Sequence, residues 1–357
     1  MPANYSPQAL ATLRAQIVTV DQRLREVLGG VEGALVDAAL HLISAGGRRL
    51  RPALVLSSAV AAGGWEAISS RVIDAAVVLE LLHQASLHHD DVLDAAPVRR
   101  GHPSVNASWG NRVAILTGDT LLAHAFSLAS MLRPEELRRF SQTVADLCSG
   151  QVAETQTLSD HRRPIVDYEA AIRKKTAALF ASACWLGAST AGAPPALTRA
   201  LEHCGAELGV AFQLIDDLLD LYGDPAMTGK PCGSDLACGV FTLPVLLALA
   251  EDPSLADLLQ GPLDENGVDV IRERVTNAHA HRRTARLASA SLSRAMIAIQ
   301  VPELHPEGRQ LLVAIAAGIH EPLEGLAFVT ASPKRLGARL ADGRASQAMP
   351  PCQAVEP

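Results

Sequence analysis

Residues 80–101 read ELLHQASLHHDDVLDAAPVRRG and place an acidic cluster at the end of an apolar run. Asp90 and Asp94 are four residues apart, so on a helix they project from one face, with Asp91 rotated from Asp90 by about 100°. The apolar residues before the cluster indicate a buried helix rather than a solvated acidic helix end, which is the competing interpretation. Buried carboxylates need a counter-charge, and carboxylate oxygens favour Mg²⁺ or Mn²⁺.

A second acidic cluster has the same spacing. Residues 212–224 read FQLIDDLLDLYGD, with Asp216, Asp217 and Asp220 again within an apolar helical pattern. Two such clusters can face each other across a cleft and hold several metal ions between them. Because protein-bound Mg²⁺ commonly shares its ligands with substrate phosphate, the pair predicts a site for a diphosphate.

The charge distribution indicates which kind of ligand the protein binds. The formal net charge is −7, and nucleic-acid binding requires a basic face, so we expect no nucleic-acid partner. The basic residues instead form short clusters, which suit a small anionic ligand. These clusters are Arg48, Arg49 and Arg51; Arg99 and Arg100; and Arg173, Lys174 and Lys175.

The cysteines and the N-terminus indicate a cytoplasmic protein. None of the six cysteines has CxxC spacing, which is typical of reduced thiols. The first residues, MPANYSPQALATLRAQ, lack the basic start and apolar core of a signal peptide. The longest uncharged run, residues 176–198, has an apolar part of about 24 Å as a helix, which is short for a membrane span. We expect no transmembrane segment.

Helical periodicity runs along the chain without convincing two-residue alternation, which predicts an all-α protein. Residues 1–330 are expected to form one domain, and residues 331–357, with four Pro and little apolar sequence, a disordered tail. Expected loops are 101–110 and 224–239. The first expected helices lie between Ser6-Pro7 and Gly29-Gly30, at 32–45, and from about residue 52 to Gly63-Gly64. A long helix then runs from Gly63-Gly64 to the first acidic cluster. Further helices are expected at 113–132, 134–150, 167–189, 195–221 and 241–250, and within 268–326.

Further motifs follow in order: GGRRLRP (46–52), HQASLHHDDVLDAAPVRRG (83–101), GD (118–119), GQ (150–151), KT (175–176), FQLIDDLLD (212–220), GKPCGSDL (229–236) and TLP (242–244). With them the chain resembles the trans-isoprenyl diphosphate synthases, also called all-trans polyprenyl synthetases. The similarity is strong over residues 40–250 and weaker elsewhere. It implies a bundle of mostly antiparallel helices around a deep central cavity, with both acidic clusters near its mouth.

The resemblance also implies a role for each matching residue. The Mg²⁺ ligands would be Asp90, Asp94 and Asp216, holding about three ions per site, with Mn²⁺ as a substitute. Ligands or waters would be oriented by Asp91, Asp217 and Asp220. The allylic diphosphate would be held by Arg99, Lys175, Thr176, Gln213 and Lys230, and isopentenyl diphosphate by Arg48, Arg51, His83 and Arg100. The six carboxylates with Lys175 and Lys230 make up the expected catalytic set.

The implied reaction joins isopentenyl diphosphate to an allylic prenyl diphosphate. Metal ions and cationic side chains would stabilise charge on the departing diphosphate, so that the allylic C–O bond ionises. The carbocation would alkylate the isopentenyl double bond, and a proton would be lost to the diphosphate. No protein nucleophile is needed, and the sequence has no convincing Ser/His/Asp or Cys/His arrangement. The family is usually homodimeric, and release of an apolar product leaves room for peripheral membrane contact.

Two residues depart from the family pattern. Arg48 stands where the family usually has lysine, which keeps the charge but changes the hydrogen-bond geometry. Val240 stands where the family has the lysine before its TLP segment, so one cation of the allylic site is missing. Lys174 is a candidate substitute; without one, affinity for the allylic substrate or its ionisation rate should be lower.

Product length depends on what blocks the cavity below the first cluster. Ala85 and Ser86, five and four residues before Asp90, are small where short-chain members are often aromatic. Leu82 and Leu79 follow further down the same helix, with Ala75 about 22 Å below by helix rise. We therefore expect a product longer than farnesyl diphosphate; a farnesyl or geranylgeranyl diphosphate synthase is the alternative.

Three other classes compete with this interpretation. His88-His89-Asp90 contains the HD dipeptide of helical metal phosphohydrolases, but that class leaves the second acidic cluster and the RRG and KT motifs unexplained. A terpene cyclase would carry a different second metal motif, with Asn and Ser ligands. A non-catalytic scaffold subunit usually loses aspartates that are intact here. His88 and His89 themselves are interpreted as packing residues or as residues that support the metal ligands, rather than as ligands.

Overall fold

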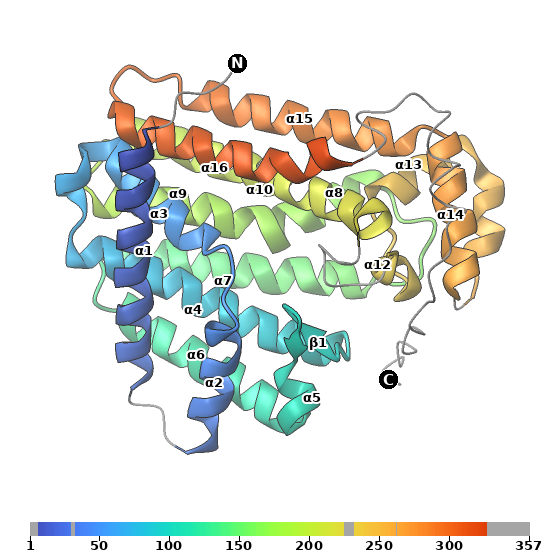
Figure 1. The fold of residues 1–357 in the computed structure, drawn as a ribbon, viewed down its shortest axis with the longest axis horizontal. Coiled ribbons are helices and arrows are strands. Elements are labelled where there is room, and N and C mark those ends of the chain that lie inside the picture. Colours follow the sequence, from blue (N-terminus) through green and yellow to red (C-terminus); the bar gives the residue numbers. More distant parts are fainter. Residues whose placement is uncertain (1–5, 30–32, 225–231, 262, 327–357) are drawn as a thin grey trace.

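The computed structural model describes residues 6–29, 33–224, 232–261 and 263–326. Nearly every described element is a helix, which confirms the all-α prediction (Figure 1). The helices are α1 (Pro7–Leu28), α2 (Ala34–Ser44), α3 (Leu50–Gly63), η1 (Trp65–Ala67), α4 (Ser70–Leu93), α5 (Val105–Trp109), α6 (Asn111–Ala129), α7 (Pro134–Thr155), α8 (Ile165–Ile172), the π-helix η2 (Arg173–Ala177), α9 (Ala178–Thr190), α10 (Pro195–Tyr222), α12 (Ser234–Ala237), α13 (Leu243–Glu251), η3 (Pro253–Leu259), α14 (Glu265–Asn277), α15 (Ala280–Ala298) and α16 (Pro306–Gly325).

Most boundaries follow from local sequence signals. The Ser6 hydroxyl accepts a hydrogen bond from the backbone N–H of Ala9 and caps α1, as expected of a Ser-Pro start. The segment 268–326 contains parts of three helices, because His279 adopts a left-handed φ of 54° between α14 and α15, and Pro306 starts α16. The predicted tail, residues 331–357, lies outside the described part of the chain.

Three predicted segments contain structure that the sequence pattern did not indicate. The expected loop 224–239 holds the short helix α12 (Ser234–Ala237). The region around the expected loop 101–110 holds a short antiparallel hairpin, β1 (Val98–Arg99) with β2 (His102–Pro103), followed by α5. The expected helix 167–189 is continuous but contains the five-residue π-helix η2, where each hydrogen bond spans one residue more than in an α-helix.

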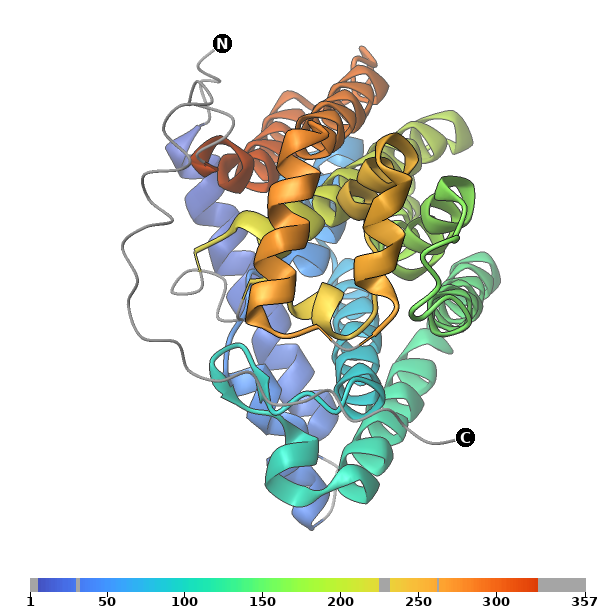
Figure 2. The same cartoon turned by 90° about the vertical axis from the view of Figure 1, so that its right-hand side faces the viewer.

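The core of the bundle is built around α3. Ten consecutive residues of this helix, 52–61, are buried, and a helix that is buried all round belongs at the centre of the fold. It packs against α4, α9 and α16, while α10 packs between α9 and α15 and α4 packs along α6. In Figure 1, α15 and α16 cover the top of the bundle, and Figure 2 views it from the end where α13 and α14 lie.

A glycine allows the closest approach in this core. A Cβ on Gly187 of α9 would collide with the carbonyl oxygen of Val55 in α3, so only glycine lets the two helices pack at this distance. The main buried apolar cluster extends from Ala9 to Leu326, and a second, small cluster of Ala38, Leu42, Val105 and Ala114 joins α2, α5 and α6. No helix within the described ranges has the length and apolarity needed to cross a bilayer.

Candidate active site

The first acidic cluster lies where α4 ends. The helix stops because Ala95 adopts a left-handed φ of 47° two residues before Pro97. Asp91 points inward: it is fully buried, and its Oδ1 accepts a hydrogen bond of 2.7 Å from Nε of Arg99, with a second guanidinium nitrogen 2.5 Å away. Arg99 is therefore held by a fork-shaped contact to a carboxylate, which fixes its orientation.

Asp90 and Asp94 are more accessible than Asp91 and face a cationic side chain. Burial raises the pKa of both carboxyls, and Lys175 acts in the opposite direction on each. Asp90 also raises the pKa of Asp94. The pair is thus a concentration of negative charge that a divalent cation would stabilise.

Lys175 is positioned by the π-helix η2. Its Nζ lies 2.5 Å from Oε1 of Glu154 in α7. Burial lowers its pKa, but Glu154, Asp90 and Asp94 outweigh that effect, so the pKa of Lys175 is raised and it stays charged. A Cβ on Gly150 of α7 would lie only 2.6 Å from the backbone nitrogen of Lys175, so this glycine is what lets α7 approach η2.

The second acidic cluster divides into one exposed and two bound carboxylates. Asp216 is exposed, whereas Asp217 is buried and accepts hydrogen bonds from the Tyr168 hydroxyl and from Nε2 of Gln213, the latter at 3.0 Å. Burial raises the pKa of Asp217 to about 7. The Thr176 hydroxyl in turn donates to Oε1 of Gln213 at 2.6 Å, so Thr176 and Gln213 orient the cluster.

Asp220 anchors the loop that follows α10. Its Oδ1 accepts a hydrogen bond of 2.6 Å from the Ser234 hydroxyl, and its two carboxylate oxygens lie 3.3–3.4 Å from the backbone nitrogen of Asp235. These contacts explain why the GSDL part of the GKPCGSDL motif accompanies the cluster. Lys230, at the start of that motif, lies outside the described residues.

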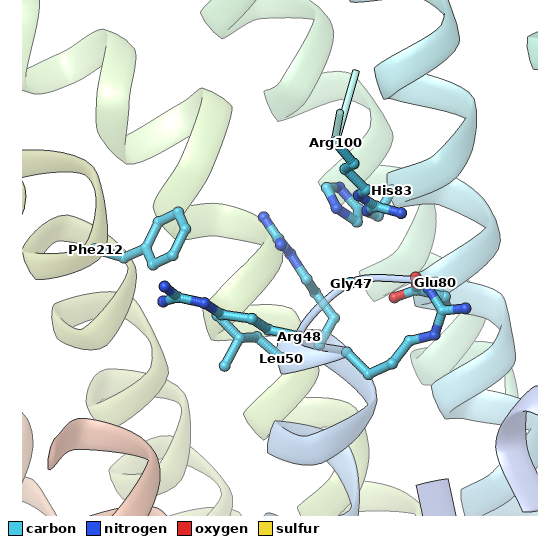
Figure 3. A pocket seen from close by; sticks show the side chains of 9 residues that line it. Gly47, Arg48, Leu50, Glu80, His83, Arg100 and Phe212 are labelled. Carbon is cyan, nitrogen blue, oxygen red and sulfur yellow. Dashed lines mark hydrogen bonds and ion pairs between the residues drawn. The ribbon is translucent and has the colours of Figure 1, made fainter. Parts of the chain in front are cut away.

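A basic pocket of about 160 Å³ opens between α3, α4 and α10 (Figure 3). In Figure 3, His83 and Arg100 stand on one side and Phe212 of α10 on the other. The lining residues are Gly47, Arg48, Arg49, Leu50, Arg51, Glu80, His83, Arg100 and Phe212. The pocket therefore connects the helix of the first cluster with the helix of the second.

Arg51 is a buried cation in this pocket. Its guanidinium carbon lies 4.9 Å from the ring centroid of Phe180 and 5.9 Å from that of Phe212. Its Nε is buried without a hydrogen-bond partner, and burial lowers its pKa to about 10. The pKa of His83 is lowered well below its usual value by burial and by nearby arginines, so this imidazole is neutral. An anion would satisfy these groups.

The four arginines of the pocket differ in how they are held. Arg48 is exposed and has no ion pair or hydrogen bond with any residue of the described ranges. Arg100 donates to the carbonyl oxygens of Leu42 and Gly46. Arg49 is buried and pairs with Asp21 at 2.8 Å and Glu80 at 3.1 Å, so its charge is already neutralised within the fold. The sequence assigned no role to this ion pair.

Metal binding needs ligands from outside the protein as well. Within the described ranges, no group of three or more His, Cys, Asp or Glu side chains could hold an ion by itself. Yet Asp90 and Asp94 carry excess negative charge, and Asp216 is exposed near the Arg51 pocket, where it raises the pKa of that arginine. Such an incomplete oxygen set suits Mg²⁺, which completes its shell with waters and substrate phosphate.

The residues expected to control product length lie in the interior. Leu82 and Ala85 are 3% and 2% exposed, respectively. The Ser86 hydroxyl donates to the carbonyl oxygen of His83 at 2.9 Å. Their influence on the product stays a prediction.

Two histidines next to the cluster contact other parts of the protein, and their role stays a prediction. His88 is completely buried, and burial lowers its pKa to about 4. Nε2 of His89 lies 3.3 Å from Asp119, and its ring occupies the space that a Cβ on Gly118 would need. The GD motif thus accommodates His89 against α6.

Two residues that form hydrogen bonds with expected site residues were not predicted from the sequence. Glu154 lies one turn after the GQ motif, and that spacing is the signal that could have marked it. Tyr168 carries no motif at all, because its contact with Asp217 joins residues 49 apart. Lys174, the candidate substitute for the missing lysine, is exposed.

An all-α bundle with a basic pocket beside two acidic clusters is the architecture of the isoprenoid synthases. A family model described as polyprenyl synthetase matches residues 32–278, and the chain belongs to this family of prenyl-transferring enzymes. It is 38% identical over 311 residues to a nonaprenyl diphosphate synthase of Mycobacterium tuberculosis, covering 85% of this chain and 92% of the relative.

Solved structures agree with this family. A heptaprenyl diphosphate synthase from Staphylococcus aureus superposes with a TM-score of 0.82 at 30% identity, covering 87% of this chain and 98% of that one. A geranylgeranyl pyrophosphate synthase from Corynebacterium glutamicum, complexed with calcium and isoprenyl diphosphate, gives a TM-score of 0.76 at 37% identity, covering 90% and 98%. A phosphohydrolase of the HD class is thereby excluded.

Proposed function

We propose that this enzyme condenses isopentenyl diphosphate with an allylic prenyl diphosphate to give an all-trans polyprenyl diphosphate longer than farnesyl. The observation that carries the proposal is the basic pocket between α3, α4 and α10, which is lined by arginines and a neutral histidine and joins the two helices that carry the acidic clusters. The relatives of this enzyme include nonaprenyl and heptaprenyl diphosphate synthases, which supports a long product.

Isopentenyl diphosphate is assigned to the basic pocket. Arg48, Arg51 and Arg100 supply positive charge, and neutral His83 can donate one N–H to a phosphate oxygen. Because Arg51 has a buried Nε without a partner, a bound diphosphate replaces hydration that the side chain has lost.

The allylic diphosphate is assigned to the space between Lys175, Arg99 and the two clusters. When bound, about three Mg²⁺ ions, or Mn²⁺ in their place, supply positive charge to the leaving diphosphate. Asp90, Asp94 and Asp216 would hold the metal, while Asp91, Asp217 and Asp220 keep the surrounding side chains in place. Lys230 completes the proposed cation set.

The reaction then follows from this arrangement. The allylic C–O bond breaks with both electrons going to the diphosphate, whose charge Lys175 and Arg99 stabilise. The resulting carbocation forms a new C–C bond with the isopentenyl double bond, and the departing diphosphate accepts the proton that is lost. The apolar side chains below the site, including Leu82 and Ala85, exclude water from the cation.

We also propose a cytoplasmic homodimer without a membrane span, whose product release allows peripheral membrane contact. An apolar strip supports self-association: Ile115, Leu116 and Phe126 of α6 are exposed to solvent in the single chain. Exposed apolar patches of this kind commonly mark protein interfaces. Light scattering during size-exclusion chromatography tests the dimer, and a monomer at micromolar concentration contradicts it. The single domain of residues 1–330 is likewise proposed, supported by the main buried cluster, which contains residues from Ala9 to Leu326.

The function is tested by incubating pure protein with labelled isopentenyl diphosphate, Mg²⁺ and each of dimethylallyl, geranyl, farnesyl and geranylgeranyl diphosphate. We expect labelled products longer than farnesyl, separated by reversed-phase chromatography. Products that stop at farnesyl or geranylgeranyl would support the short-chain alternative, which the similarity to a geranylgeranyl pyrophosphate synthase keeps open. No labelled prenyl product with any primer would refute the proposal.

A further inference from the structure

Arg163 is a buried cation whose guanidinium has no hydrogen-bond or ion-pair partner in the described part of the chain. It lies between α7 and α8 and is 6% exposed. Its Nε is buried without a hydrogen bond, and its guanidinium forms no ion pair with any residue of the described ranges. Burying part of a guanidinium without a hydrogen bond or a counter-ion is unfavourable, and a bound anion would reduce that cost.

The surroundings of Arg163 connect it to the active site. Its guanidinium carbon lies 5.5 Å from the ring centroid of Tyr168, whose hydroxyl donates to Asp217 of the second acidic cluster. Burial lowers the pKa of Arg163, and Glu154, the partner of Lys175, acts most strongly against that effect. The side chain is therefore linked through Tyr168 to the second cluster, and Glu154 lies close enough to act on its charge.

The loop of Arg163 also contacts the loop of Val240. The backbone N–H of Ser159 donates to the carbonyl oxygen of Gly239 at 2.8 Å. Gly239 has a φ of 75°, and the Ser159 hydroxyl occupies the space that a side chain on Gly239 would need. The two loops are thus pressed together beside the second cluster, at the position where the family pattern has a lysine and this chain has valine.

We propose that Arg163 supplies the positive charge for the allylic diphosphate on the side of the second acidic cluster, where Val240 brings none. This inference rests on the proposed function. Arg163 reaches the site from the neighbouring loop, so the chain keeps a cation there although its position in the sequence has changed. Lys174, which is exposed, is then not the substitute.

The test is the variant Arg163→Met, which keeps much of the packing on Tyr168 but removes the charge. We expect the KM for farnesyl diphosphate to rise roughly tenfold, the effect of losing one charged hydrogen bond, with the KM for isopentenyl diphosphate unchanged. Because an unpaired buried charge is removed, the melting temperature of the metal-free variant should not fall. Arg162→Met is the matched control, since the Arg162 side chain is 85% exposed.

A second variant tests whether the charge itself is what matters. Adding Val240→Lys to Arg163→Met should return the KM for farnesyl diphosphate toward the wild-type value, and Arg163→Lys should raise it less than Arg163→Met does. An unchanged KM in Arg163→Met, an equal rise for both substrates, or loss of folding would overturn the inference. So would a tenfold rise in Lys174→Met with none in Arg163→Met. If the wild-type enzyme transfers no prenyl group, the proposed function fails first.

Discussion

Gly150→Ala tests how closely α7 must approach the π-helix η2. The added Cβ would lie 2.6 Å from the backbone nitrogen of Lys175, and ordinary contact begins at 3.4 Å. The two helices would have to separate by about 0.8 Å, and because the obstacle is backbone, no side-chain rotation relieves it. Overpacking of this kind costs roughly 1–3 kcal/mol of folding free energy.

The same displacement should reduce catalysis, because it changes the position of Lys175 relative to Asp90 and Asp94. A shift approaching 1 Å in a positioning group lowers turnover by roughly 10–100-fold. Prenyl transfer at saturating substrate measures the loss of kcat, and urea unfolding measures stability.

Gly318→Ala in α16 is the matched control, since nothing lies within 4 Å of its added Cβ. Both variants gain the same helix propensity, roughly 0.5–1 kcal/mol, so the difference between them isolates the overpacking. If Gly150→Ala matches Gly318→Ala in stability and keeps wild-type kcat, the close approach of α7 and η2 is not what positions Lys175.

The remaining predictions concern the product, the metal and the ion pair of the basic pocket. Ala85→Phe should shorten the product, and an unchanged chromatographic profile would remove Ala85 from chain-length control. Asp90→Asn should lower kcat with Mg²⁺ by roughly 100-fold or more. The control Asp257→Asn, at a surface residue, should leave kcat unchanged. Equal kcat values for the two variants would show that Asp90 holds no metal. Arg49→Met should lower the free energy of unfolding, measured in urea, by roughly 3–5 kcal/mol, because it leaves the Glu80 charge buried without its ion-pair partner. Adding Glu80→Gln should recover part of this loss. An Arg49→Met variant as stable as the wild type would contradict the argument.

The helices and both acidic clusters could be predicted because their signals are local. Apolar periodicity marks α4 and α10, and the spacing of Asp90 to Asp94 fixes which carboxylates share a face. The family resemblance added the basic pocket, since Arg48 and Arg51 come from one motif and His83 and Arg100 from another, and no spacing rule joins the two.

The contacts that hold these residues could not be predicted from the sequence. Tyr168 contacts Asp217 only because α10 folds back along η2 and α9, and a single sequence carries no signal for that packing. The left-handed backbone of Arg49, with a φ of 46°, is also unmarked, because non-glycine residues rarely adopt it. Its cost is offset by ion pairs with Asp21 and Glu80, which lie far from it in the chain.

The π-helix η2 determines how the side chains of α8 are rotated about the helix axis relative to those of α9. It contains one residue more than an α-helical turn needs, and a residue corresponds to about 100° of rotation. Removing a single residue there would leave a regular helix from α8 to α9 but would turn Tyr168 away from Asp217. The extra residue in η2 therefore sets the direction of Tyr168 separately from that of the residues after it, so that Lys175 faces one acidic cluster while Tyr168 faces the other.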